Sequence, residues 1–222
     1  NVISSRWVYA RKVDECGKLL RLKARLCARG FSQVPGEDFG ETFAPTGTLR
    51  VLRAMLAEAS GRSDITTHQW DCTSAFLHSD IDGDLYMEPP AGISIPDGKV
   101  WKLRKGVYGL KQAGKLYYDL VHSVLVGLGC VQCTDVDDCL FILREGDNWV
   151  KILVYVDDYA VTTNSPELYA RLWTGVSAAF DITDYGQLGL FLGIKISRGS
   201  DYTITLDQSH YVDILMKRFD VP

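Results

Sequence analysis

The sequence lacks the features of membrane, fibrous and disordered proteins. Its longest apolar runs, residues 152–156 and 188–194, are far shorter than the roughly 18 residues that a membrane-spanning helix needs. With 46% apolar and 23% charged residues it matches an ordinary globular protein, which excludes disorder, collagen-like repeats and coiled coil as overall descriptions. Initiator Met and an apolar signal core are also missing, so we expect a segment of a longer polypeptide without a membrane partner.

Cysteine is present, but its spacing indicates neither a disulfide framework nor a complete zinc site. The six residues are Cys16, Cys27, Cys72, Cys130, Cys133 and Cys139. A chain of this length without a secretory signal does not need disulfides, so we expect free thiols in a reducing compartment. A structural zinc site needs four ligands, and only His122 is near enough to complete the Cys130, Cys133 and Cys139 set. Small buried thiols are therefore the favoured interpretation.

The net charge of −4 is unusual for a nucleic-acid-binding protein, but the charge is unevenly distributed. Residues 1–30 carry eight basic and two acidic side chains, and residues 99–119 carry six basic and one acidic, which leaves −15 for the rest. Two basic segments beside an acidic remainder could hold a polyanion over a carboxylate-lined site. Two solvated strand or helix faces are the alternative.

Hydrophobic periodicity predicts a mixed α+β fold. Alternation at residues 6–13 and 19–29 predicts a hairpin with a basic face, turning at residues 14–17. The other expected strands are residues 66–70, 85–87, 100–103, 139–143, 150–155, 159–163, 194–197 and 203–206. Expected helices are residues 49–59, 110–128, 166–180 after a Ser165 cap, and 209–219. Because strands and helices do not alternate one for one, an antiparallel sheet backed by helices is favoured.

The sharpest chemical feature is Tyr155-Val156-Asp157-Asp158 between two strand-like runs. Adjacent carboxylates raise each other's pKa unless a cation neutralises them, and hard divalent cations prefer carboxylate oxygen. A polar β-turn is an equally good interpretation of this pair alone. Asp71 after a short strand and the basic, glycine-containing segment 103–113 before a long helix favour the metal site, because the helix start could meet phosphates.

Together, these segments resemble the copia-type reverse transcriptase of LTR retrotransposons. The resemblance runs in order along nearly the whole chain, and the ordered set is far more specific than the Tyr-x-Asp-Asp box alone. Its landmarks are Arg6-Trp7-Val8, Lys23-Ala24-Arg25-Leu26, Arg29-Gly30-Phe31, Glu41-Thr42-Phe43-Ala44-Pro45, Asp71, Ala75-Phe76-Leu77-His78, Tyr86-Met87, Pro89-Pro90, Tyr108-Gly109-Leu110-Lys111-Gln112-Ala113, Tyr155-Val156-Asp157-Asp158 and Phe191-Leu192-Gly193-Ile194.

The resemblance implies an α+β right-hand polymerase fold with an antiparallel palm sheet backed by helices. Fingers would occupy about residues 1–65 and 80–110, the palm 66–79 and 111–206, and the start of a thumb 207–222. Asp71, Asp157 and Asp158 would be the catalytic carboxylates of an RNA-directed DNA polymerase and would bind two Mg²⁺ ions, with Mn²⁺ as a substitute. We expect Asp71 and Asp157 to bind directly, Asp158 to support them, and the Cys72 carbonyl to be a further ligand.

The resemblance also implies nucleotide and primer sites. Phe76 matches the aromatic position beneath the sugar, where a ring excludes a 2′-hydroxyl; a core phenylalanine is the alternative. Lys23, Arg25 and Arg29 match the triphosphate-binding part of the fingers, unless they form an exposed basic strand face. The remaining candidates are Tyr108, Gly109, Lys111 and Gln112 for nucleotide or template, and Tyr155, Phe191, Leu192 and Gly193 for the primer. For residues 191–194 a buried apolar strand is the simpler interpretation.

Expected partners are an RNA or DNA template with primer, deoxynucleoside triphosphates, and the rest of a Pol polyprotein, with integrase upstream and RNase H downstream. The expected location is the cytoplasm, inside virus-like particles, with a nuclear stage. Gly114 and Ser79 stand where the family usually has Pro and Gly, but no carboxylate is missing. One alternative is a non-catalytic fragment without thumb and RNase H that at most binds nucleic acid. A nucleotide cyclase is disfavoured, because it has no template for the basic segments to hold.

Overall fold

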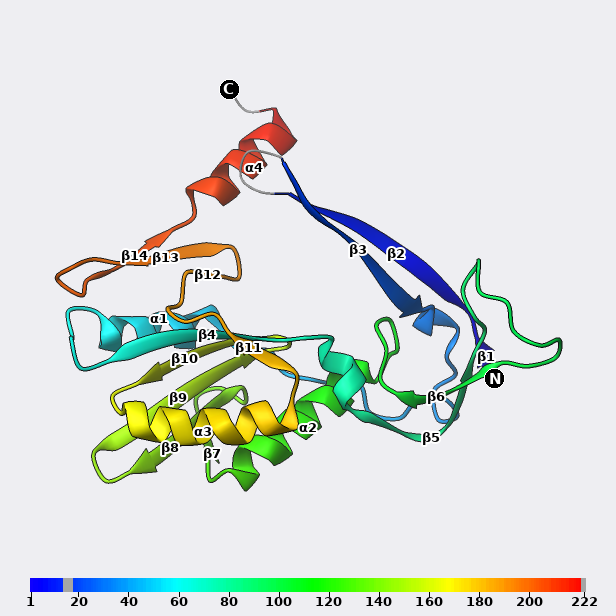
Figure 1. Cartoon of the computed structure of the whole chain (residues 1–222), viewed down its shortest axis with the longest axis horizontal. Coiled ribbons are helices and arrows are strands. Elements are labelled where there is room, and N and C mark those ends of the chain that lie inside the picture. Colours follow the sequence, from blue (N-terminus) through cyan, green and yellow to red (C-terminus); the bar gives the residue numbers. More distant parts are fainter. Residues whose placement is uncertain (14–17, 221–222) are drawn as a thin grey trace. The chain divides into compact units, whose positions relative to one another are not determined.

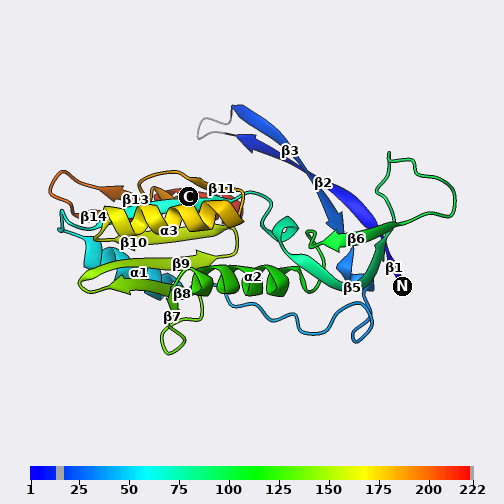
Figure 2. The same cartoon turned by 60° about the horizontal axis from the view of Figure 1, so that its bottom comes forward.

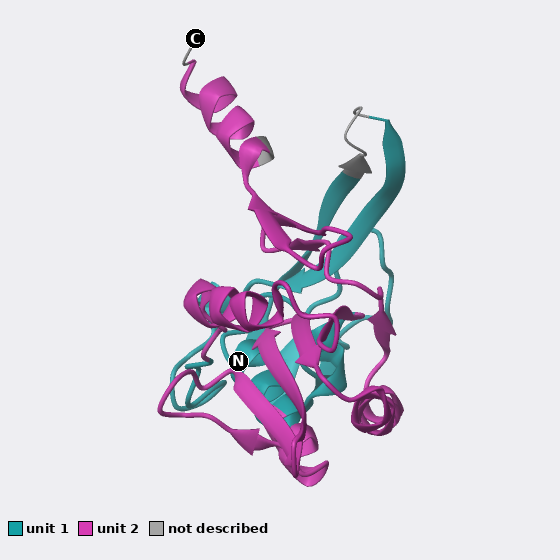
Figure 3. Ribbon diagram, turned by 90° about the vertical axis from the view of Figure 1, so that its left-hand side faces the viewer, with its two compact units in different colours: residues 1–44, 74–121 teal, residues 45–73, 122–222 magenta. Residues whose placement is uncertain are grey.

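The computed structural model describes residues 1–13 and 18–220, without the side chains of Lys12, Val13 and His210. The predicted turn at residues 14–17, with Cys16, lies outside this description. The chain divides into two compact units (Figure 3): residues 1–44 with 74–121, and residues 45–73 with 122–222. These bounds cut across the predicted fingers and palm segments, and the names fingers, palm and thumb stay a prediction. No described helix is long and apolar enough to cross a membrane.

The first unit contains the predicted basic hairpin, β2 (Ser5–Val13) and β3 (Leu19–Ala28). The strands are antiparallel, with Val8 opposite Arg25 and Ala10 opposite Lys23. Because side chains alternate along a strand, one face carries Arg6, Arg21, Lys23 and Arg25, and the other carries Trp7, Tyr9, Leu20, Leu22 and Leu26. Tyr9, Leu20 and Leu22 are exposed, so this two-stranded ribbon has little core of its own.

A three-stranded sheet in order β1–β5–β6 completes the first unit. Its strands are β1 (Val2–Ile3), β5 (Asp80–Met87) and β6 (Trp101–Lys105). Ile3, Leu85, Met87, Leu103 and Leu110 form its buried core. Two single-turn 3₁₀ helices, η1 (Gly30–Ser32) and η2 (Ala75–His78), lie in the connections. Strands β5 and β6 are longer than predicted, whereas β1 is too short to show a periodic pattern.

The second unit is built on a six-stranded antiparallel sheet in order β11–β4–β10–β9–β8–β7 (Figure 1). The strands are β4 (Thr66–Cys72), β7 (Val131–Gln132), β8 (Leu140–Glu145), β9 (Asn148–Tyr155), β10 (Asp158–Thr163) and β11 (Ile182–Asp184). The sequence predicted the four long strands but missed the short edge strands β7 and β11. The mixed α+β class with antiparallel sheets is confirmed.

The helices begin and end close to the predicted residues. They are α1 (Leu49–Ala59), α2 (Ala113–Gly127), α3 (Pro166–Ala179) and α4 (Ser209–Phe219). Ser165 caps α3 as predicted, since its hydroxyl accepts a hydrogen bond from the Leu168 N–H at 3.3 Å. Helix α2 begins three residues later than predicted, because Gly109 has φ +90° and the chain before Ala113 forms turns.

Helices pack on both faces of the large sheet (Figure 2). On one face, Trp70 contacts Tyr169 and Trp173 of α3, and Phe141 contacts His122 of α2 at 6.0 Å between ring centroids. On the opposite face, Lys151 of β9 pairs with Glu58 of α1. Because alternate residues of a strand share a face, Asp71, Tyr155 and Asp158 belong to the α1 face, opposite α2 and α3.

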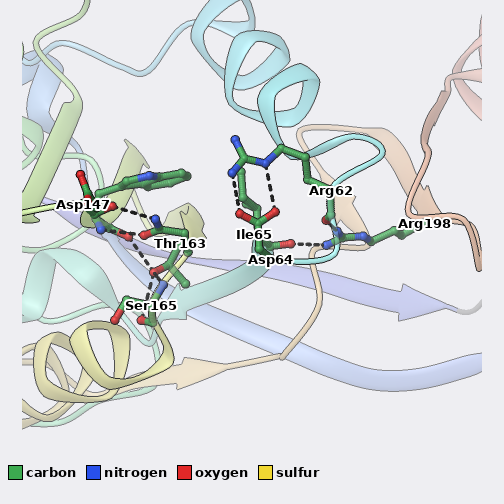
Figure 4. Close-up of polar contacts among 9 residues, drawn as sticks. Arg62, Asp64, Ile65, Asp147, Thr163, Ser165 and Arg198 are labelled. Carbon is green, nitrogen blue, oxygen red and sulfur yellow. Dashed lines mark hydrogen bonds and ion pairs between the residues drawn. The ribbon is translucent and has the colours of Figure 1, made fainter.

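Another small sheet of the second unit packs beside α1 (Figure 1). Its strands are β12 (Leu190–Phe191), β13 (Ile194–Arg198) and β14 (Ile204–Asp207). Arg198 fastens it to the loop between α1 and β4, donating hydrogen bonds to the carbonyls of Ile65 at 2.7 Å and of Arg62 (Figure 4). Arg62 in turn pairs with Asp64. The small sheet is therefore tied directly to the residue that precedes β4.

Candidate active site

Three predicted carboxylates lie at one end of the β4–β10–β9 part of the sheet. Asp71 of β4 is directly opposite Asp158 of β10, and Asp158 is also opposite Tyr155 of β9. Directly opposed residues of an antiparallel pair have Cβ atoms about 4.5–5.5 Å apart and point to the same face. Asp157 is the neighbouring residue in the β9–β10 turn, and all three aspartates are half-buried. The fold thus brings together residues that are 86 positions apart in the sequence.

The turn that carries Asp157 has the common two-residue length but a strained backbone. Only Val156 and Asp157 lie between the paired residues Tyr155 and Asp158, and Val156 has φ +56°. A positive φ in a β-branched residue is a genuine strain, costing about 1–3 kcal/mol. The Asp157 carbonyl accepts a hydrogen bond from the Cys72 N–H at 2.7 Å, which ties the turn to β4 one residue after Asp71. The surrounding sheet therefore holds a turn that the sequence alone disfavours.

On the opposite face of the sheet from Asp71 and Asp158, aromatic residues pack against α3. Trp70 and Tyr159 are fully buried neighbours on the face toward α3. The Trp70 indole N–H donates to the Tyr169 hydroxyl at 2.9 Å, and that hydroxyl donates to Asp184 at 2.5 Å. Burial and the Asp184 carboxylate raise the pKa of Tyr169, so it stays neutral. Burial lowers the pKa of His68, whose ring stacks on Tyr169 at 4.0 Å between centroids.

The donor set suits a hard divalent cation, since it consists of carboxylate oxygens. Asp71 and Asp158 share one face, and Asp157 adds a third carboxylate in the adjoining turn. Within residues 1–13 and 18–220, however, no three His, Cys, Asp or Glu side chains are already arranged as a metal cluster. The chemistry of the residues fits the predicted ions, and binding would require the three carboxylates to converge on them. The Cys72 carbonyl stays a predicted ligand.

Three predicted nucleotide-site residues contact one another in the first unit. The Arg25 guanidinium lies over the Tyr108 ring at 5.3 Å from its centroid. Tyr108 meets Phe76 edge to face at 4.8 Å, and Phe76 also contacts Tyr117. Phe76 is half-buried, so its ring belongs to a packed cluster and still reaches the surface. Ser79, where the resemblance implies Gly, donates from its hydroxyl to the Phe76 carbonyl at 2.9 Å.

The remaining nucleotide-site candidates form the junction between β3 and the segment before α2. The Ala28 N–H donates to the Tyr108 carbonyl at 2.7 Å, and the Gly30 N–H to the Gly109 carbonyl at 3.1 Å. A Cβ on Gly109 would lie 2.1 Å from the Ala28 carbonyl oxygen, and a Cβ on Gly30 would lie 2.0 Å from the Gly109 oxygen. Both positions therefore require glycine. This explains structurally why Gly30 and Gly109 belong to the segments that carry the family resemblance.

Buried amides complete this junction. Gln33, which sequence reasoning missed, donates to Gln112 at 3.0 Å and accepts from the Lys111 N–H at 2.8 Å. Gln112 donates to the Asp38 carbonyl at 2.9 Å and is buried. These hydrogen bonds satisfy the Gln112 side chain within the protein, so its burial does not require a bound nucleotide. Lys111 and Arg29 are exposed, whereas Lys23 is partly covered.

The primer-site candidates lie in the second unit. Phe191 and Ile194 are paired across a turn made by Leu192 and Gly193, which have φ +50° and +77°. Phe191 is buried and Leu192 half-buried, so the apolar strand predicted as the simpler interpretation coexists with an exposed turn at Gly193. Tyr155 is half-buried beside Asp158.

The predicted free thiols are confirmed for the five described cysteines, Cys27, Cys72, Cys130, Cys133 and Cys139. Burial raises the pKa of Cys130 and of Cys139 to about 12. Both thiols are therefore protonated and unreactive near neutral pH. The zinc alternative finds no support among the described residues.

The chain is similar to known proteins along its whole length. Residues 1–222 match the family described as reverse transcriptase (RNA-dependent DNA polymerase). The chain is 37% identical over 219 residues to the retrovirus-related Pol polyprotein from transposon RE1 of Arabidopsis thaliana, covering 98% of this chain and 15% of that protein. It is 34% identical over 223 residues to the corresponding polyprotein from transposon TNT 1-94 of Nicotiana tabacum, covering 99% and 17%.

Among solved structures, the RNA-dependent RNA polymerase of bacteriophage phi12 matches with a TM-score of 0.45 and 10% identity, over 97% of this chain and 45% of that one. That likeness is too low to carry an argument. The sequence relatives are decisive by themselves, although the chain spans only about one sixth of their length. The chain belongs to the reverse transcriptase family, as the reverse transcriptase domain of a copia-type Pol polyprotein.

Proposed function

We propose that this domain catalyses template-directed transfer of deoxynucleotides to a primer, with Asp71, Asp157 and Asp158 as its catalytic carboxylates. The observation that carries the proposal is the direct pairing of Asp71 with Asp158 beside the Asp157 turn. A single cation can relieve the repulsion of carboxylates this close, which gives the site its affinity for divalent metal. The rigid sheet behind it fixes the carboxylate backbones before substrate arrives.

Asp71 and Asp157 would hold two divalent cations, Mg²⁺ or Mn²⁺, with Asp158 and the Cys72 carbonyl in support. The chemistry that these ions supply when bound is Lewis acidity toward the primer 3′-hydroxyl and the triphosphate. The chain's own part is to hold the ions on one face of the sheet and to direct the triphosphate with Lys23, Arg25 and Arg29. Phe76, packed between Tyr108 and Tyr117, would exclude a 2′-hydroxyl from the sugar site.

We place the primer end near Tyr155 and the Leu192–Gly193 turn, and the template near Tyr108, Gly109 and Lys111. In the full polyprotein, integrase upstream and RNase H downstream would accompany this domain, in cytoplasmic virus-like particles with a nuclear stage. The second candidate function is that of a fragment that binds nucleic acid without polymerising. It is favoured by the basic face of the β2–β3 ribbon, because such a face can bind phosphates without any catalytic step.

Primer extension on an RNA template separates the two functions. We expect incorporation only of the deoxynucleotide complementary to the template, by this chain or by a longer polypeptide that continues past Pro222. Binding without extension in both polypeptides would contradict the enzyme and favour the fragment.

Metal binding can be tested without turnover. Fe²⁺ bound in place of Mg²⁺ generates hydroxyl radicals that cut the nearby backbone, so we expect cleavage near residues 71 and 157 that excess Mg²⁺ suppresses. The Asp71→Asn variant should lose both cuts, whereas Asp147→Asn, at a hairpin tip elsewhere in the same unit, should retain them. Cleavage that does not depend on Asp71 would contradict the assigned site.

A further inference from the structure

One side chain connects the strand of Asp71 directly to the predicted primer turn. Gln69 precedes Asp71 by two residues in β4 and therefore lies on the same face. Its side-chain amide donates to the Leu190 carbonyl at 2.9 Å, immediately before the buried Phe191 and the Leu192–Gly193 turn. The sequence shows Gln69 only as a polar neighbour of Asp71, because its acceptor is 121 residues away.

The backbone of Gln69 strengthens the same connection. Its N–H donates to the Gly186 carbonyl at 2.9 Å, and its carbonyl accepts from the Tyr185 N–H at 2.8 Å. Gln69 thus holds the segment that leads from β11 to β12 by main chain and side chain together. The side-chain bond is the only one of the three that a substitution can remove without altering the backbone.

The small β12–β13–β14 sheet is held at two places along β4. Arg198 binds the carbonyl of Ile65, just before β4 begins, while Gln69 binds Leu190 near the end of β4 that carries Asp71. Phe191 and Ile194 are buried, so packing keeps the hairpin in place. The Gln69 bond adds a directional contact that sets where the turn lies along the strand, since burial alone is non-directional.

We propose that Gln69 is a positioning residue that fixes the Leu192–Gly193 turn relative to Asp71, and so places the primer 3′-end against the catalytic carboxylates. The proposal rests on the proposed function for its primer role. It rests on the hydrogen bonds of Gln69 alone for its structural role. A misplacement of about 1 Å at a reacting group can lower a rate by about 100-fold, so one such contact can matter greatly.

The test uses Gln69→Met, which keeps the length of the side chain and removes its donor, and Gln69→Glu, which keeps the shape and places a carboxylate against the Leu190 carbonyl. Gln132→Met is the matched control, because Gln132 also donates from its side chain to a backbone carbonyl, that of Asp138 at 2.7 Å, in the same unit. Two readouts are compared: hydrogen exchange of residues 188–196, and single-turnover incorporation at saturating deoxynucleotide.

We expect faster exchange across residues 188–196 and a rate lowered roughly tenfold to 100-fold in both Gln69 variants, with little change in deoxynucleotide Kd. Gln132→Met should change neither quantity. A merely structural role would lower the melting temperature alike in Gln69→Met and Gln132→Met and leave the rate per folded molecule unchanged. Unaltered exchange and rate in Gln69→Met, beside an active wild type, would overturn this inference alone. A wild type that extends no primer, even within a longer polypeptide, would overturn the proposed function and the primer role together.

Discussion

The carboxylates and the basic side chains of this domain are presented by two very different pieces of sheet. Asp71 and Asp158 lie on inner strands of a six-stranded sheet with helices on both faces, over the buried Trp70 and Tyr159. Lys23 and Arg25 lie on a two-stranded ribbon whose other face exposes Tyr9 and Leu22. Metal-binding carboxylates need a fixed geometry, whereas cations that attract phosphates act over a Debye length of about 8–10 Å. The packed sheet therefore suits the carboxylates, which need fixed positions, and the exposed ribbon suits the basic side chains, which do not.

The comparison also shows where each region is vulnerable. The large sheet carries a strained turn at Val156, which the hydrogen bond from Cys72 to Asp157 helps to hold. The ribbon depends on the junction at its base, where Gly30 and Gly109 meet. Substitutions at the ribbon's base should therefore affect folding, those along the ribbon should affect binding, and those at the sheet's end should affect chemistry.

The largest expected effect on folding comes from Gly109→Ala. The new Cβ would lie 2.1 Å from the Ala28 carbonyl, at a residue with φ +90°, so the backbone junction must break. We expect unfolding free energy to fall by about 3 kcal/mol or more, measured by urea denaturation. Gly98→Ala is the control in the same unit, because it has φ +74° but open space around it, and it should cost far less. Equal losses would contradict the role of the close approach.

Phe76→Ala should change which sugar is accepted. If the ring excludes a 2′-hydroxyl, kcat/KM for ribonucleotides should rise relative to that for deoxynucleotides, because truncation opens space without touching the carboxylates. A core residue would instead cost about 3–5 kcal/mol of stability and affect both sugars alike. Measuring both kcat/KM values on folded protein, with Phe141→Ala as a buried control in the large sheet, distinguishes the two. An unchanged ratio would remove Phe76 from the sugar site.

Charge removal on the ribbon should give a smaller, graded effect. Besides directing the triphosphate, Lys23 and Arg25 would also meet phosphates of the primer–template. Lys23→Gln and Arg25→Gln should then weaken primer–template binding, and each lost phosphate contact should flatten the dependence of log affinity on log salt by about 0.7–0.9. Arg11→Gln, on the opposite face of the same ribbon, should leave the slope unchanged. Equal slopes for all three variants would place the basic face away from nucleic acid.

The smallest expected effect is a pH dependence from His68. Burial lowers its pKa in the folded state, so the unfolded chain binds a proton first as the pH falls. The pKa of His68 in the unfolded chain is about 6.5. The free energy of unfolding should therefore be highest well above that pH and should decline below it, until His68 is also protonated in the folded state. His68→Gln should abolish this decline in denaturation curves from pH 7.5 to 5. A decline that persists in the variant would assign it to other groups.

Sequence reasoning succeeded where a signal was local. Helices α1 and α4 begin and end at the predicted residues, because apolar spacing marks an amphipathic helix along its whole length. It failed for β7 and β11, because strands of two or three residues have no measurable period. That Asp71 would lie close to Asp158 was expected only from the resemblance, and their direct strand pairing was not predicted. The hydrogen bonds of Gln33 and Gln69 had no sequence signal, since their partners lie 78 to 121 residues away.

The central claim is that Asp71, Asp157 and Asp158 catalyse nucleotide transfer, and Asp157→Asn tests it most directly. The change removes charge but keeps shape, so the fold should persist and the melting temperature without Mg²⁺ should stay level or rise as carboxylate repulsion falls. Single-turnover extension of a primer on RNA should drop by roughly 10⁴-fold or more, the scale of losing an essential catalytic group. Extension that survives the substitution on folded protein would contradict the account.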